Sequence, residues 1–296
     1  MHSYQLIQDF KDNDTFRESF FTLADLVFKV DFRPWYEKGC WTYKFICYAY
    51  VDKERVIANV SVNQMKLLIH GKKKRAIQIG TVMTHPYYRH QGLIKKLMHH
   101  VLDIYQDSYD FIYLFANQTV LDFYPAFGFQ RVQEYKYILD AASLPKPTSS
   151  LHPAYRKLDI HDRDDFSLLR EFAVDGISYA KIIDVRDNTH LRMFYFLIAL
   201  PDCIYYLEEY DAVILFQQSE DQLHLFDVLS RTRQPLEAMI SNMISLGTKE
   251  IRCHFIPELE NKQLRIEKIT GEDMLFVRPT VDFHTAYPLI PLTSHA

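Results

Sequence analysis

Residues 79–94 read IGTVMTHPYYRHQGLI, and this stretch decides the fold. Residues 76–83 are rich in Ile, Val and Thr, which suit a half-buried strand. Pro86 ends the strand, because proline cannot donate to a strand ladder. After the loop, apolar residues recur at helical spacing: Leu93, Ile94, Leu97, Met98, Val101, Leu102 and Tyr105. The stretch therefore predicts a strand, a short loop and an amphipathic helix.

The loop carries the chemistry of this stretch. It leads into the first turn of a helix, where backbone N–H groups have no partner within the helix. The helix dipole adds roughly half a positive charge at that end, so the end attracts anions. Gly92 lets the backbone approach a ligand, and Arg89 adds a fixed cation with several donors. The residues alone predict an anion site, and a pyrophosphate is the anion we expect there.

Residues 89–94 (RHQGLI) resemble the acetyl-CoA loop of the GCN5-related N-acetyltransferases, or GNAT family. The pattern of that loop is Arg or Gln, two variable residues, Gly, one variable residue, then Gly or Ala. Ile94 departs from the third fixed position, where a small residue lets the helix lie close to the pyrophosphate. Downstream, a strand candidate at 110–115 is followed by Asn117, then by Tyr124 seven residues later, and by a Gly-Phe pair at 128–129. These features follow the order and spacing of the family, and the resemblance covers about residues 1–140.

The resemblance implies an α/β fold with a mixed sheet and acetyl-CoA as cosubstrate. The residues that it implies for binding acetyl-CoA are Val82, Met83, Thr84, Arg89, His90, Gln91, Gly92, Leu93, Ile94, Asn117 and Tyr124. Among these, the backbone amides near 82–84 would bind the pantetheine arm and the thioester oxygen. An ordinary strand end is the alternative interpretation of that segment.

Two of these residues are predicted to act in catalysis. Tyr124 is the expected proton donor to the leaving sulfur, because a phenol with a pKa of ~10 is protonated at neutral pH. Its alternative interpretation is an aromatic residue of the core. Asn117 is expected to bind the pantetheine arm or a water molecule, or else to cap a helix.

No general base follows from the sequence. The family often places a Glu on the central strand, where this chain has Gln78 and Gly80. The remaining candidates are His85, Asp31, Glu37 and Asp122.

Composition limits the class of protein. The chain has 296 residues, 48% hydrophobic and 24% charged, which is ordinary for a globular protein of about two domains at ~150 residues each. A net charge of −4 argues against a nucleic-acid partner. No apolar run reaches the ~18 residues that span a bilayer, and the N-terminus lacks a signal pattern, so we expect no membrane contact and a cytoplasmic protein. The cysteines lack ligand spacing and are expected to be reduced, and nothing completes a metal set around His99 and His100, so no metal is expected.

The chain is predicted to contain two copies of one fold. Residues 143–153 hold three prolines and three serines, so we place a linker at 143–154 between an N-terminal catalytic domain (1–142) and a C-terminal domain (155–296). In the first copy we expect a helix at 12–30 that Asp12 or Asp14 caps, strands at 43–51 and 55–69, a turn at 71–75, and strands within 130–139 that close the sheet. In the second we expect helices at 162–175, 189–199 and 235–246 and strands at 203–207, 212–216, 222–229, 250–256 and 274–278. The second copy's loop, residues 230–235, has no glycine and contains Pro235, so this GNAT-like copy is predicted to be degenerate and to bind no CoA.

The predicted function is transfer of an acetyl group from acetyl-CoA to a primary amine, with a small molecule as acceptor. A protein or peptide acceptor is the first alternative. A non-catalytic acyl-CoA sensor or scaffold is the second, which Ile94 and the missing carboxylate base favour. The protein is expected to be a monomer or a homodimer.

Overall fold

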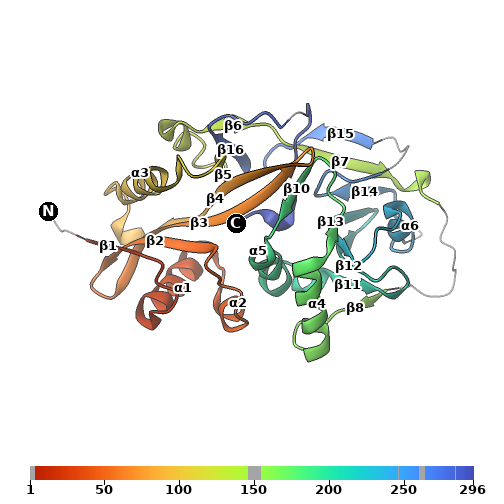
Figure 1. The fold of residues 1–296 in the computed structure, drawn as a ribbon, viewed down its shortest axis with the longest axis horizontal. Coiled ribbons are helices and arrows are strands. Elements are labelled where there is room, and N and C mark those ends of the chain that lie inside the picture. The colour runs from red at the N-terminus through yellow and green to blue at the C-terminus, as the bar shows by residue number, and fades with distance from the viewer. Residues whose placement is uncertain (1–3, 146–154, 246, 260–263, 284) are drawn as a thin grey trace.

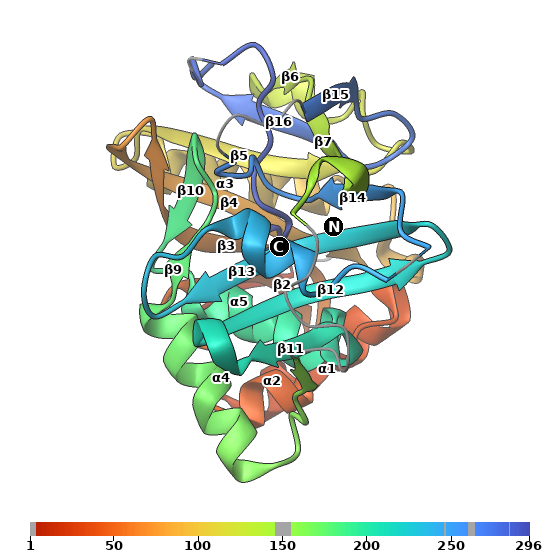
Figure 2. The same ribbon diagram turned by 90° about the vertical axis from the view of Figure 1, so that its right-hand side faces the viewer.

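The computed structural model describes residues 4–145, 155–245, 247–259, 264–283 and 285–296. Within these residues the chain forms two mixed sheets, each flanked by helices (Figure 1). The predicted α/β class with a mixed sheet in each of two copies is confirmed. Figure 2 views the molecule from the side of the second sheet.

The first sheet has the strand order β1-β2-β3-β4-β5-β16-β6, with β10 paired to β3. Its strands are β1 (Gln5–Gln8), β2 (Phe45–Asp52), β3 (Arg55–Ile69), β4 (Lys72–Thr84), β5 (Phe111–Ala116), β6 (Gln130–Val132), β10 (Ile183–Arg186) and β16 (Met274–Arg278). All of the pairs are antiparallel except β4 with β5.

The second sheet has the order β8-β11-β12-β13-β14-β7-β15, with β9 paired to β13. Its strands are β7 (Tyr135–Asp140), β8 (Arg156–Lys157), β9 (Ile177–Ser178), β11 (Ile204–Leu207), β12 (Ala212–Ser219), β13 (Gln222–Ser230), β14 (Glu250–Cys253) and β15 (Leu264–Lys268). Here the parallel pair is β13 with β14. Each sheet therefore repeats the same plan: an antiparallel series, one parallel pair, and then a strand inserted before the last edge.

The helices divide between the faces of the sheets. The α-helices are α1 (Asp14–Phe28), α2 (Arg33–Glu37), α3 (Leu93–Tyr105), α4 (Arg163–Asp175), α5 (Thr189–Phe194) and α6 (Leu236–Ser241), and a π-helix η4 (Tyr195–Ala199) extends α5. Short 3₁₀ turns include η1 (Pro86–Tyr88), η2 (Tyr124–Phe127), η3 (Ala141–Ser143), η5 (Pro201–Cys203), η6 (Glu208–Tyr210) and η7 (Leu292–Ser294). Helix α3 covers one face of the first sheet, and α1, α2, α4 and α5 lie together on the other side, where they share one apolar core (Figure 1).

The two copies exchange their last strands. β16 comes from the C-terminal part and lies between β5 and β6, while β7 comes from the N-terminal part and lies between β14 and β15. The prediction that 130–139 closes the first sheet is therefore wrong beyond β6. Second-copy backbone holds the chain where it leaves the first sheet: Gln133 donates to the carbonyl of Ile269, and Glu134 accepts from the amide of Ile290. The predicted linker at 143–154 lies mostly outside the described residues, and the domain bounds stay a prediction.

Three local predictions are corrected. The turn expected at 71–75 is confined to His70 and Gly71, both at positive φ, so the basic run at 72–75 pairs with β3 as part of β4. Two left-handed residues make the tight hairpin that strand twist favours. The N-cap of α1 is Asn13, whose side chain accepts from the amide of Phe16, and not an aspartate. Helix α6 ends at Ser241, short of the predicted 246.

Candidate active site

The loop between β4 and α3 ends at a helix terminus that no side chain caps. Gly92 is the N-cap of α3 and adopts a left-handed conformation, with φ 72° and ψ 15°. His90 also has a positive φ of 63°, so the loop turns twice within three residues. Leu93, Ile94 and Lys95 of the first turn line one cleft. Their amide groups and the positive end of the helix dipole are suited to an anion.

Neighbouring side chains hold this loop in place and leave its arginine free. The hydroxyl of Tyr4 donates to the side chain of Gln91 at 3.1 Å. Arg89 is exposed and lines the cleft, and it makes no ion pair with a carboxylate of the described residues. A guanidinium without a protein partner is available to phosphate oxygens.

A bulge in β4 opens the sheet beside the loop. β4 pairs with β5 only from Ala76 to Ile79, and both strands continue beyond this pairing. Thr81 lies at a shift in the β3–β4 register with a φ of 48°, which is unusual for a β-branched residue. The buried side chain of Asn59 donates to the carbonyl of Thr81 at 3.0 Å and to the hydroxyl of Ser61 at 2.9 Å. This bond fixes the bulge, and residues 80–84 border the cleft.

The loop, the bulge and the end of β5 enclose a cleft of about 900 Å³. The cleft brings together all of the site residues predicted from the sequence: Val82, Met83, Thr84, Arg89, His90, Gln91, Gly92, Leu93, Ile94, Asn117 and Tyr124. They share one space, while the role of each stays a prediction.

Comparison with known proteins identifies the domain around this cleft. The segment from residue 12 to residue 132 matches the model of a family described as an acetyltransferase (GNAT) domain. Residues 12–132 belong to the GNAT acetyltransferases. No curated protein matches the chain.

Solved structures share the fold over nearly the whole chain. A probable N-acyltransferase from Enterococcus faecalis V583, described as a conserved protein of unknown function, is 14% identical with a TM-score of 0.59, over 93% of this chain and 72% of that one. A GCN5-related N-acetyltransferase from Anabaena variabilis is 14% identical with a TM-score of 0.55, and the match covers 93% of this chain and 72% of that one. A putative acetyltransferase from Pyrococcus horikoshii is 11% identical with a TM-score of 0.50, and the match covers 100% of this chain and 97% of that one. At these identities the likeness shows the fold.

Tyr124 lines the cleft, and its side chain is deeply buried. It is 5% exposed and packs against the rings of Phe123, Phe129 and Phe276. Burial raises the pKa of Tyr124 to about 12, so its hydroxyl is protonated at neutral pH. Asn117 is exposed, and its side-chain oxygen accepts from the amide of Thr119 at 3.0 Å.

None of the four residues considered as general base lines the cleft of the GNAT domain. Asp31 pairs with Arg33, and Asp122 pairs with Arg131. His85 accepts from the amide of Tyr87, and burial lowers its pKa. The acidic side chain that does line the cleft, among the described residues, is Asp273.

The second copy contributes to the cleft as well. Phe194, Asp273 and Ala296 line it, and Figure 1 shows the C-terminus near the middle of the molecule. Gly80 of β4 makes room for Ala296, because a Cβ at Gly80 would lie 3.0 Å from the Cβ of Ala296. The cleft is therefore a composite of both copies.

The C-terminal segment reaches the cleft through the corresponding gap of the second sheet. β13 and β14 pair only as far as Leu225 and Cys253, and beyond that point the amide of Leu292 donates to the carbonyl of His254. Thr293 donates to the buried carboxylate of Asp227 at 2.7 Å. Protein backbone thus fills the place that remains open in the GNAT domain.

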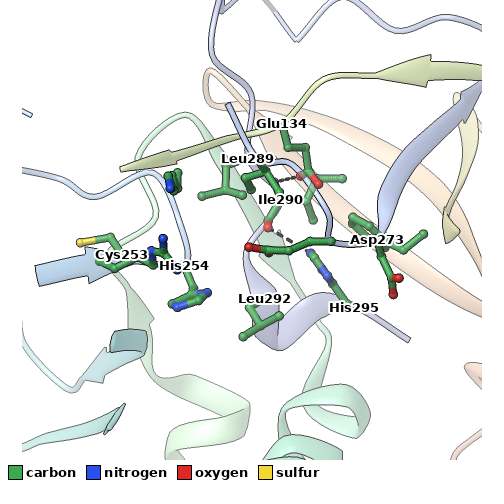
Figure 3. A pocket seen from close by; sticks show the side chains of 13 residues that line it. Glu134, Cys253, His254, Asp273, Leu289, Ile290, Leu292 and His295 are labelled. Carbon is green, nitrogen blue, oxygen red and sulfur yellow. Dashed lines mark hydrogen bonds between the residues drawn. The ribbon is translucent and has the colours of Figure 1, made fainter. Parts of the chain in front are cut away.

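Glu134 and His295 fasten this C-terminal segment (Figure 3). The carboxylate of Glu134 accepts from the amide of Ile290 at 2.8 Å, and the ring of His295 bonds to the carbonyl of Ile290 at 3.1 Å. His295 also stacks on Phe115, with ring centroids 3.6 Å apart. These residues border a small cavity of about 250 Å³, and burial raises the pKa of Glu134 to about 8.

Several site residues were missed from the sequence, although a signal existed for Asn59. Asn59, Ser61 and Asn63 alternate within the apolar β3, and polar residues on one face of a central strand indicate a buried network. Phe194 carried no comparable signal, because it lies in an apolar helix far along the chain. Elsewhere in the described part of the chain, no group of three or more His, Cys, Asp or Glu is placed to hold a metal. None of the described helices is long and apolar enough to cross a membrane.

Proposed function

We propose that the protein transfers an acetyl group from acetyl-CoA to a primary amine. The observation that carries the proposal is that one cleft is lined both by an uncapped helix terminus with Arg89, which has no ion-pair partner among the described residues, and by a protonated Tyr124. The first suits a pyrophosphate, and the second suits a leaving thiolate. Acetyl-CoA supplies the activated acetyl group.

The residues of the cleft divide the work as follows. The amides of the first turn of α3, with Arg89, hold the pyrophosphate. Residues 82–84 border the cleft at the bulge, where their amides are proposed to bind the thioester oxygen and to stabilise its developing negative charge. The neutral amine attacks the thioester carbon, the C–S bond breaks, and Tyr124 gives its hydroxyl proton to the departing sulfur. The amine nitrogen loses its extra proton to solvent, from which the phenolate of Tyr124 is reprotonated. Binding both reactants in one enclosed space contributes the proximity that a reaction between two substrates needs.

Thiol release tests the proposal. The full chain with acetyl-CoA is mixed with a panel of primary amines, and free thiol is followed with and without each amine. We expect release that depends on the amine, together with the acetylated amine in the mass spectrum. Release that is equal without an amine, or no release with any amine, contradicts the proposal.

The alternative is a sensor that binds acyl-CoA without turnover. Ile94 favours it, since this residue lines the cleft where the family has a small side chain, and so does the single, exposed carboxylate of Asp273. Tight binding of acetyl-CoA in calorimetry together with no thiol release on any amine would identify a sensor.

A further inference from the structure

One wall of the cleft is apolar and lies on the face of the first sheet opposite α3. The side chains that line it come from the end of α1, the turn after it, and α5: Val27, Phe28, Val30, Phe32 and Phe194. We propose that this apolar wall is the acceptor subsite and that it selects a primary amine carried on an apolar body. The inference rests on the proposed acetyl transfer and names its substrate class.

The exposure of this apolar wall points to a ligand. Phe28 is 43% exposed, and Val27 and Val30 are half-buried. Apolar side chains gathered along a cleft, in contrast to single exposed ones, mark places where a ligand removes them from water. Burying such surface is favourable by ~25 cal/mol per Å², so an apolar body on the amine adds affinity here.

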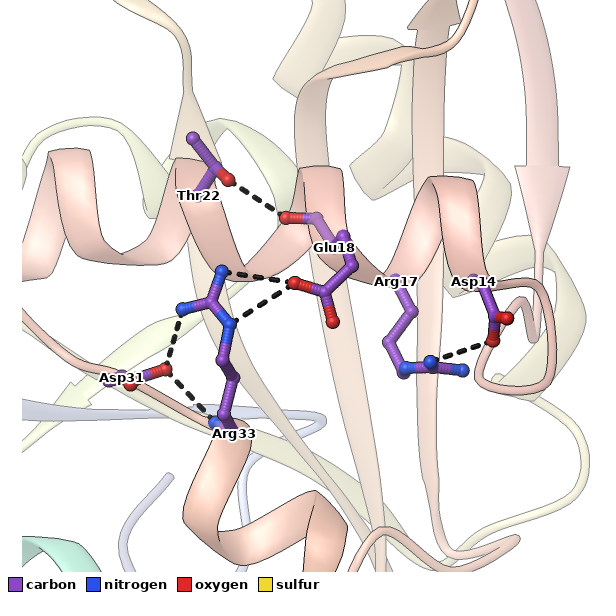
Figure 4. A network of polar contacts seen from close by, with 6 residues as sticks. All are labelled: Asp14, Arg17, Glu18, Thr22, Asp31 and Arg33. Carbon is purple, nitrogen blue, oxygen red and sulfur yellow. Dashed lines mark hydrogen bonds and ion pairs between the residues drawn. The ribbon is translucent and has the colours of Figure 1, made fainter.

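The wall is also held rigidly, which a selective subsite needs. Arg33 bridges α1 and the following turn by bonds to Glu18 and Asp31 (Figure 4). The ring of Phe32 packs against Phe194 with centroids 5.4 Å apart.

Two bonds anchor α5, and with it Phe194, to the first copy. The indole N–H of Trp35 donates to the carbonyl of His190 at 2.7 Å, and the His190 ring bonds to Asn63 at 3.0 Å. A π-helix begins directly after Phe194, and such turns are frequent at functional sites.

The charges around the cleft disfavour an acceptor with several ammonium groups. Arg89 and Lys95 line the end assigned to the pyrophosphate, and Asp273 is the acidic side chain among the described lining residues. Asp31, close to the wall in sequence, is paired with Arg33. One ammonium on an apolar body matches the one acidic side chain among the described lining residues and an apolar wall. Apolar surroundings also favour the neutral form of the amine, which is the form that attacks. They would therefore help in a site that has few groups able to remove the amine proton.

A small amine panel tests the inference. Phenethylamine and hexylamine are compared with ethanolamine and spermidine as acceptors for the full chain, and we expect kcat/KM to be about tenfold or more higher for the first two. Phe28→Ala should raise the KM for phenethylamine by about tenfold, lower kcat/KM for ethanolamine much less, and leave the Kd for acetyl-CoA unchanged. Leu26→Ala is the matched control, because Leu26 is equally exposed on α1 but does not line the cleft.

The possible failures are distinguishable. Preference for spermidine or ethanolamine, or equal effects of Phe28→Ala and Leu26→Ala, overturns the apolar subsite and leaves acetyl transfer standing. If phenethylamine binds the CoA-saturated protein in calorimetry, loses affinity in Phe28→Ala and yet is never acetylated, the subsite is supported and the transfer is overturned. Absence of both binding and turnover overturns the two together.

Discussion

The junction of β4 with α3 and the junction of β13 with α6 occupy the same place in the two copies, but their polar groups are used differently. In the first, Gly92 leaves the helix amides open and Arg89 has no described carboxylate partner. In the second, Pro235 takes the N-cap position and α6 is only six residues long. Both sheets open beyond the parallel pair, and the cleft of about 900 Å³ lies at the first junction, where the described chain does not refill the gap.

The basic residues of the second junction form ion pairs within the protein. Arg231 pairs with Glu171 and Asp211, and Arg233 pairs with Glu258. The amide of Gln234 is taken by the hydroxyl of Tyr179 at 2.9 Å. Donors that are free in the first copy are thus bound by protein in the second. These contacts favour the prediction that the second copy is degenerate and supports the first.

The largest expected effect on turnover comes from substituting Tyr124, a residue of the first copy. The second copy has no tyrosine between residues 251 and 273, so it offers no corresponding proton donor there. Tyr124→Phe removes the proton donor, and we expect kcat to fall by roughly 10²-fold, with the Kd for acetyl-CoA unchanged. Steady-state thiol release and calorimetry measure the two quantities. An unchanged kcat would show that Tyr124 is a packing residue, like the rings around it.

The burial of Glu134 beside the filled gap of the second sheet can be tested by the pH dependence of the free energy of unfolding. Its ordinary pKa of 4.5 is raised to about 8 by burial, so between these values the unfolded chain releases a proton that the folded chain keeps. The free energy of unfolding should therefore fall as pH rises through this window, by roughly 3 kcal/mol from pH 5 to pH 8.

Glu134→Gln keeps an acceptor for the amide of Ile290 but cannot ionise, so its denaturation curves should change much less with pH. Glu272→Gln is the control, because Glu272 borders the same cavity and is exposed. Identical pH dependence in wild type and Glu134→Gln would mean that the carboxyl group is not buried when the protein is folded.

Arginine substitutions at the two junctions compare them directly. Arg89→Ala removes a cation that is free to bind phosphate, and we expect the Kd for acetyl-CoA to rise about tenfold, less so at high salt. Arg233→Ala removes an ion pair within the protein, so it should lower the melting temperature slightly and leave that Kd unchanged. Equal losses of acetyl-CoA affinity in both variants would place the nucleotide across the two copies.

The sequence predicted the loop, α3 and the cleft residues because the information there is local. A Gly at an N-cap, a proline after a strand and a helical apolar period act within about twenty residues. The exchange of β7 and β16 was missed, since short apolar strands do not specify which distant partner they pair with. The general-base candidates do not line the cleft for a related reason: Asp31 is paired with Arg33, while Asp273 reaches the cleft from the other end of the chain.

Tyr113 gives the smallest expected effect and sharpens the contrast with Tyr124. It lies on β5 opposite Val277 of the exchanged strand β16, fully buried, and its hydroxyl has no partner among the described residues. Removing an unpaired buried hydroxyl costs little, so Tyr113→Phe should leave the free energy of unfolding unchanged or raise it by up to about 1 kcal/mol. Thiol release should not change, because Tyr113 does not line the cleft. A loss of stability in urea denaturation would mean that the hydroxyl is hydrogen-bonded after all, and that the contact between β5 and the exchanged strand β16 has a polar component in addition to its apolar core.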